Sequence, residues 1–192
     1  MSMQTLVCCL EEASAREMLA GVLPRVLPEG WNVQYMVFEG KQDLLRRIEM
    51  RVRGWQVPHS RFLVLCDQDA QNCKQLKAQI AMNLLAAKKT VKIRIACHEL
   101  ENFYLGDLAA VAKGLACVNV GKLASRALYR CPDQISNAPE QLRRITGHVY
   151  QKCAGSRAIA SYLDVSGTNR SQSFNALIKA VRELTGADEP GL

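Results

Sequence analysis

The sequence predicts an α/β fold with a mostly parallel, doubly wound sheet flanked by helices. Two observations lead to this prediction. Apolar runs of strand length alternate with segments of helical periodicity over residues 5–97, and acidic residues follow three of the runs. Strands that alternate with helices of this length form βαβ units, which build parallel sheets. The acids then fall at the carboxyl ends of strands, where such sheets bind ligands.

Each strand and helix of this pattern can be placed in order. We expect strands at 5–10, 32–38, 62–66 and 91–97, and helices at 15–27, 43–52, 73–87 and from about residue 99. Apolar residues at steps of four, such as Leu76, Ile80 and Leu84, form the helix faces that cover the sheet. Ser14 and Glu17 have the spacing of a capping box near the start of the first helix.

Strand signals fade beyond Asp107. Pro132 and Pro139 stand in segments typical of turns and helix starts, and residues 174–184 have the periodicity of a last amphipathic helix. A chain of 192 residues is long enough for one core and short for two domains. We therefore expect a single domain over residues 1–192, with an α/β core at 1–113 and a mainly helical part at 114–192.

The composition indicates where in the cell the protein is expected and which partners it is expected to bind. No apolar run approaches the ~20 residues of a membrane helix, and the N-terminal segment is acidic where a signal peptide would be basic. We expect a cytoplasmic protein that does not contact membranes. Its eight cysteines include no C-x-x-C pair, so we expect reduced thiols. The formal net charge of +7 favours a polyanionic partner, such as DNA or RNA.

Acidic side chains follow the first, third and fourth predicted strands. They are Glu11 and Glu12, Asp67 and Asp69, and Glu99 and Glu101. Residues two apart on an extended segment point the same way, so Asp67 and Asp69 can share a ligand. Carboxylates gathered in one cleft repel unless a cation lies between them, and Mg²⁺ prefers such oxygen ligands. The sequence predicts a site for Mg²⁺ or Mn²⁺; the alternative is that these acids only cap helices.

At these residues the sequence resembles the Toprim superfamily, the catalytic domain of topoisomerases, bacterial primases and OLD-family nucleases. Glu11 stands where that family has a Glu after its first strand, and Asp67-Gln68-Asp69 matches its D-x-D. The sequence departs from the pattern at Glu12, where a Gly is usual, and at Ala15, where an Asp is common.

The resemblance is closer to a bacterial family of small stand-alone Toprim-like proteins of unassigned function. Members and related proteins are found beside ATPases in phage-defence or abortive-infection loci. The matching segments are 11–17, 38–44, 67–69, 99–107 and 150–152, which span nearly the whole chain. The resemblance implies metal-dependent phosphodiester cleavage. Its metal set is Glu11, Asp67, Asp69, Glu101 and Asp107, with Glu99 assisting catalysis.

Basic residues complete the expected site. OLD-like nucleases use a late Lys to stabilise charge on the scissile phosphate, and Lys152 takes that position by resemblance. We expect Lys41, Arg157 and Arg170 to contact nucleic-acid phosphates, with a solvated surface as the alternative. Residues 152 and 157 are five apart and do not quite share a helix face, so only one should point at the metal.

Several alternatives stay open. A degenerate Toprim module would bind nucleic acid or a partner ATPase without cleaving. A response-regulator receiver has a similar layout, but it needs a Ser or Thr after its fourth strand and a Lys after a fifth. Here Cys97 and His98 follow the fourth strand, and no fifth is evident. No Walker motif is present, so any ATP use requires a partner. The choice between DNA and RNA and the presence of a homo-oligomer also stay open.

Overall fold

A four-stranded parallel sheet forms the centre of the protein. The computed structural model describes residues 3–187. The strands are β1 (Gln4–Leu10), β2 (Trp31–Val37), β3 (Ser60–Asp67) and β4 (Val91–Ala96), in the order β2-β1-β3-β4. All three pairings are parallel. The predicted α/β class is thus confirmed. A receiver needs five strands, whereas the described residues form these four.

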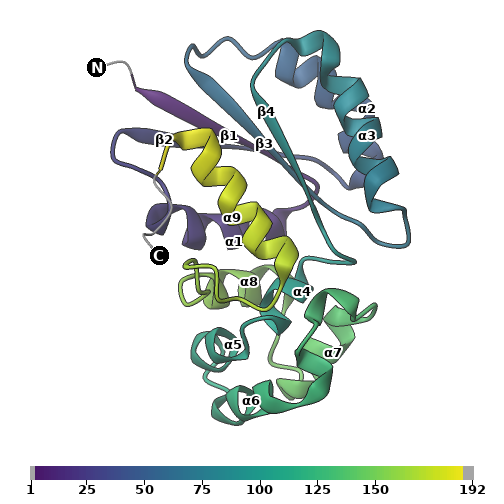
Figure 1. The fold of residues 1–192 in the computed structure, drawn as a ribbon, viewed down its shortest axis with the longest axis vertical. Coiled ribbons are helices and arrows are strands. Elements are labelled where there is room, and N and C mark those ends of the chain that lie inside the picture. The colour runs from purple at the N-terminus through teal and green to yellow at the C-terminus, as the bar shows by residue number, and fades with distance from the viewer. Residues whose placement is uncertain (1–2, 188–192) are drawn as a thin grey trace.

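Helices cover both faces of the sheet (Figure 1). Helices α1 (Ala13–Val22) and α9 (Gln172–Thr185) lie on one face, and α2 (Lys41–Arg53) and α3 (Cys73–Leu84) on the other. Strand β1 is buried on both sides: Cys8 belongs to the core under α1 and α9, and Cys9 to the core under α2 and α3. This explains why its sequence is continuously apolar rather than alternating.

A helical part lies beyond the carboxyl edge of the sheet, at the bottom of Figure 1. It contains α4 (Glu101–Leu105), α5 (Leu108–Gly114), α6 (Val118–Gly121), α7 (Ala138–Ile145) and α8 (Lys152–Ala160). Short 3₁₀ turns occur at Leu23–Arg25, Leu85–Ala87, Lys122–Ser125, Ala127–Tyr129 and Pro132–Gln134. Helix α8 packs against α1 and α5, and this packing joins the helical part to the sheet layer.

Two local predictions differ from the structure. Helix α9 lies after residue 113 yet contacts β3 and β4, while α4 and most of α5 lie before residue 114 and belong to the helical part. The predicted boundary at residue 113 therefore does not separate the sheet layer from the helical part. Residues 1–2 and 188–192 of the predicted domain lie outside the described residues. The capping box is wrong because α1 starts earlier. Glu12 is its N-cap, and Ser14 lies inside the helix and donates a hydrogen bond to Glu12.

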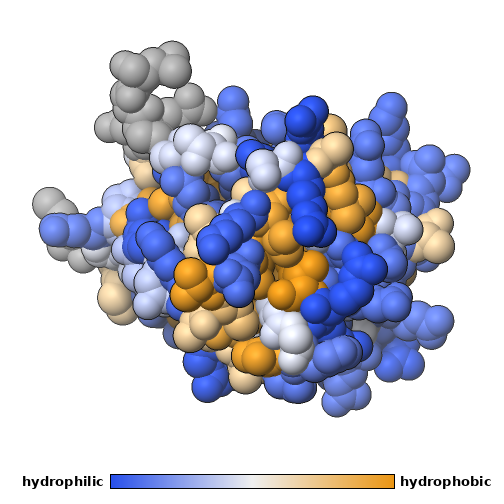
Figure 2. Space-filling model, turned by 90° about the horizontal axis from the view of Figure 1, so that it is seen from below, coloured by the Kyte–Doolittle hydropathy of each residue, from blue (hydrophilic) through white to orange (hydrophobic). Residues whose placement is uncertain are grey.

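Figure 2 shows the end of the molecule formed by the helical part, where apolar side chains gather among hydrophilic ones. Exposed apolar residues of this part include Val118, Leu128 and Val149. Within residues 3–187, no helix has both the length and the apolar character that crossing a bilayer requires.

Candidate metal centre

The ends of β1 and β3 are tied together by the side chain of Glu11. Its Oε2 atom accepts a hydrogen bond of 3.0 Å from the Asp67 N–H, and its own N–H donates to Leu65 O at 3.2 Å. Burial raises the pKa of Glu11 even though the Asp67 N–H lowers it. The carboxylate is therefore held at the carboxyl edge of the sheet, directly beside the last residue of β3.

Asp67 is buried in the middle of a group of acids. Burial raises its pKa well above the usual range, and the negative charges of Glu12, Glu11 and Glu101 raise it further. Only Lys152 is a cation among the main influences on this pKa. The predicted gathering of acids from separate strand ends is thus present in the structure. We call Glu11, Glu12, Asp67 and Glu101 the acidic cluster.

Glu101 brings a fully buried carboxylate to this cluster from α4. Its Oε1 atom accepts a hydrogen bond of 2.9 Å from the Tyr150 hydroxyl. Its Oε2 atom is buried and has no hydrogen-bond partner among the described residues. Burial raises the pKa of Glu101, against the lowering effect of the Tyr150 hydroxyl. A buried oxygen without a partner is costly, so this atom is suited to receive a cation or a donor from a ligand.

Lys152 is the first residue of α8 and faces the acidic cluster. Its Nζ atom lies 2.6 Å from Glu12 Oε2. Burial lowers its pKa, but the bond to Glu12 and the charges of Glu101 and Asp67 outweigh burial and raise it overall. The side chain therefore keeps its proton and supplies the positive charge that the predicted site requires.

Asp69 and Lys41 form a second pair at the rim. Strand β3 ends at Asp67, and Asp69 has a left-handed backbone with φ 52°. Strand alternation therefore does not set the direction of Asp69, contrary to the expectation that Asp67 and Asp69 point the same way. The Asp69 carboxylate forms an ion pair with the Lys41 ammonium. Lys41, which we expect to contact phosphate, thus already has an acidic partner.

Glu99 lies between the buried acids and an open hollow of about 440 Å³. Asp69, His98 and Ser136 also line this hollow. Burial and the charge of Glu101 raise the pKa of Glu99. The predicted assisting acid therefore sits where a molecule in the hollow would meet the cluster.

The acids are close but are not arranged as a finished metal site. Among the described residues, no three His, Cys, Asp or Glu side chains together could hold a metal ion in their present positions. Two lysines pair with the cluster and its rim, at Glu12 and Asp69. The donor set still fits Mg²⁺, since it consists of carboxylate oxygens and includes the unpartnered Oε2 of Glu101.

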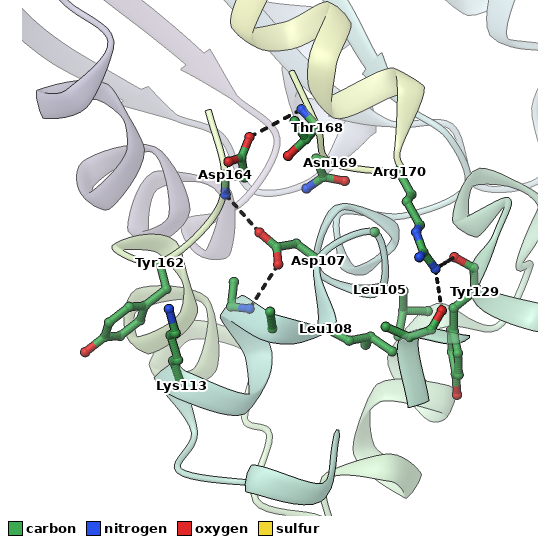
Figure 3. Close-up of a pocket in the computed structure, with 14 residues that line it drawn as sticks. Leu105, Asp107, Leu108, Lys113, Tyr129, Tyr162, Asp164, Thr168, Asn169 and Arg170 are labelled. Carbon is green, nitrogen blue, oxygen red and sulfur yellow. Dashed lines mark hydrogen bonds between the residues drawn. The ribbon is translucent and has the colours of Figure 1, made fainter. Parts of the chain in front are cut away.

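Asp107 does not join this cluster. It is the N-cap of α5, where its carboxylate accepts hydrogen bonds from Ala110 N–H at 3.0 Å and from Asp164 N–H at 2.9 Å (Figure 3). Both oxygens are thus used by main-chain donors that join α5 to the segment after α8. The expectation that Asp107 belongs to the metal set has no support in this placement.

Two predicted phosphate contacts are also occupied elsewhere. Arg170 lines the same pocket as Asp107, and its guanidinium donates to the main-chain oxygens of Ala124 and Tyr129 (Figure 3). Arg157 lies on an exposed face of α8, with its Nε 2.6 Å from Glu17 Oε2 on α1. As expected from their spacing, only one of the two cations on α8, Lys152, faces the acids.

Sequence reasoning missed the roles of Glu12 and Tyr150. Glu12 pairs with Lys152, whereas its position after the first strand indicated either a metal-site acid or a helix-start acid. Tyr150 lies within a segment that carries the family resemblance, but nothing in its local pattern indicated Glu101 as its partner. The hydrogen bond joins residues 49 positions apart. Such a pair becomes visible only in the folded chain.

The fold and the site together define a parallel α/β protein with a lysine-paired cluster of acids at the carboxyl edge of its sheet. The chain belongs to the family described as Domain of unknown function (DUF4276), which matches residues 10–182. No curated protein and no solved structure matches the chain.

Proposed function

We propose that this protein is a Toprim-like nuclease that hydrolyses nucleic-acid phosphodiesters with Mg²⁺ or Mn²⁺. The observation that carries the proposal is the Glu101 carboxylate, which is fully buried, held at Oε1 by Tyr150, and without a partner at Oε2. A charged oxygen is rarely left in this state. The acids Asp67 and Glu12 lie near it, and Lys152 supplies one positive charge against the whole acidic cluster, so a further cation suits this oxygen.

Each residue of the site has a role in this reaction. Glu11, Asp67 and Glu101 would hold the ion, with Asp69 as a further ligand once it leaves Lys41. A bound divalent ion supplies a water of lowered pKa as the nucleophile. Glu99 lies at the hollow and takes a proton from the attacking water. Lys152 keeps its proton and contacts the phosphate oxygens, where negative charge grows in the transition state.

The proposal also includes a cellular role, which rests on the resemblance to Toprim-like proteins. Related Toprim-like proteins are found beside ATPases in phage-defence loci, and we propose that this chain is the effector partner of such an ATPase in the cytoplasm. A purified chain that cleaves at full rate, indifferent to any ATPase encoded next to it, would contradict this part.

Thermal unfolding with added metal tests the site directly. An ion that binds only the folded state stabilises it, and at a hundred times its Kd we expect a rise of about 5–10 °C in Tm. The shift should disappear in Asp67→Asn and Glu101→Gln, and remain in Asp107→Asn, whose carboxylate lies in another pocket. Equal shifts in wild type and in the Asp67→Asn, Glu101→Gln double variant would rule out the site.

A binding module without nuclease activity is the second candidate. The observation that favours it is the pairing of Lys152 with Glu12 and of Lys41 with Asp69, which neutralises acids without any metal. The two candidates differ in one measurement, the cleavage of a labelled oligonucleotide with Mn²⁺. Cleavage that Asp67→Ala abolishes identifies the nuclease. Binding without cleavage, in wild type and variant alike, identifies the module.

A further inference from the structure

Two hollows near the acids share a wall residue, Ser136. The first, described above, has Asp69, Glu99 and Ser136 in its wall. Ser136 also lines a second hollow of about 520 Å³. The walls of the second hollow come from the two 3₁₀ turns at residues 127–134 and from the start of α7.

The lining of the second hollow is positive. Its residues are Ala127, Leu128, Arg130, Cys131, Gln134, Ile135, Ser136 and Asn137, which include one cation and no acid. Arg130 is exposed, and the described part of the chain provides no acidic partner within ion-pair distance. The nearby acid in the sequence, Asp133, accepts hydrogen bonds from Ser171 Oγ at 2.6 Å and Ser173 N–H at 2.8 Å. Asp133 is thus engaged with the start of α9.

We propose that a nucleic-acid strand lies along these two hollows, with a backbone phosphate on Arg130 and the next part of the strand at Glu99 and the acidic cluster. This inference rests on the proposed function and names the substrate path of the same site. A free guanidinium suits a phosphate because its planar fork matches two phosphate oxygens. Leu128, half exposed in the same wall, offers an apolar surface to a base.

This path differs from the one that the sequence predicts. Lys41, Arg157 and Arg170 are the expected phosphate contacts, but all three are bonded within the protein. Arg130 was not among the candidates because an isolated Arg in a turn has no distinctive pattern. The tertiary structure places Arg130 beside the hollow. It also leaves Arg130 without an acidic partner among residues 3–187.

Binding without metal tests the path separately from cleavage. Fluorescence anisotropy with labelled single-stranded DNA and RNA in EDTA should give a linear fall of log affinity with log salt. Arg130→Ala should weaken binding to all sequences alike and reduce this slope by about one. Arg53→Ala is the matched control: it removes the same charge from the far end of α2, at the opposite edge of the sheet, where Arg53 pairs with Glu49.

Cys131 gives a second readout, because it is an exposed free thiol in the wall of the second hollow. Bound oligonucleotide should slow its alkylation, followed by mass spectrometry, in wild type and in Arg53→Ala but not in Arg130→Ala at the same concentration. Inorganic phosphate alone should not protect it.

The outcomes separate the two proposals. If Arg130→Ala keeps the wild-type slope and Cys131 reacts equally with and without oligonucleotide, the path is wrong, while metal-induced stabilisation still supports the site. If wild type binds neither DNA nor RNA, the path and the proposed substrate class both fall.

Discussion

Lys152 Nζ lies 2.6 Å from Glu12 Oε2, so a cation at the start of α8 neutralises the acid at the N-cap of α1. The pair crosses the junction between the helical part and the sheet layer. The same ammonium also influences the pKa values of Asp67, Glu99 and Glu101. Lys152 is therefore the internal counter-ion of the acidic cluster.

Replacing Lys152 with Ala should lower cleavage by about 10²–10³, the scale for loss of one transition-state donor. Nucleic-acid binding and the fold should be nearly unchanged. The measurement is the single-turnover rate at saturating substrate. Arg157→Ala is the matched control, since it removes a cation one and a half turns later on α8 that pairs with Glu17 instead. A wild-type rate in Lys152→Ala would remove Lys152 from the mechanism.

Tyr150→Phe should weaken Mn²⁺ binding by about 10–100-fold, because the hydroxyl orients the Glu101 carboxylate. Calorimetric titration of the metal measures this. Tyr129→Phe is a matched control: its buried hydroxyl also makes one hydrogen bond, from Gln141 Nε2 at 2.6 Å, but Tyr129 lines the pocket of Asp107 and Arg170 and makes no bond to the acidic cluster. Equal Mn²⁺ affinities in both variants would show that Tyr150 does not position a ligand.

Asp107→Ala should destabilise the fold without affecting metal binding. The change removes the N-cap of α5 and leaves the Asp164 N–H without its acceptor, which together cost about 1–3 kcal/mol in the free energy of unfolding. Urea unfolding gives the loss. The Mg²⁺-induced rise in Tm should equal that of wild type. A lost rise in a variant that is still folded would return Asp107 to the metal set.

Gly114→Ala should destabilise the junction that carries Lys152. A Cβ at residue 114 would lie 2.5 Å from Ala158 O on α8, so the two helices would have to separate, at a cost of about 1–3 kcal/mol. Gly121→Ala is the control, because its Cβ would make only an ordinary contact of 3.6 Å. Urea midpoints that are equal for the two variants would contradict this account of the packing between α5 and α8.

Much of the fold was predictable because its signals are local. The continuous apolar runs of β1 and β3 and the alternation of strands with helices indicated a parallel sheet. Parallel strands end at one edge, so Glu11 and Asp67 were expected together, and the structure confirms that their ends meet. The start of α1 was misjudged because Ser14 and Glu17 fit a capping box in the sequence, whereas the helix begins at Ala13 with Glu12 as its N-cap.

By itself, the sequence determined the class of fold and the strand ends at which acids accumulate. Both depend on local signals, because hydrophobic periodicity and the acids that follow each strand can be recognised within a few residues. Only the tertiary structure decided which groups meet. Glu101 accepts a hydrogen bond from Tyr150, and Glu12 forms an ion pair with Lys152. Asp107 instead caps a helix in another pocket. These contacts form because helix packing brings distant residues within hydrogen-bond distance. Partners of this kind depend on the position of α8 against α1, and no local pattern encodes that position.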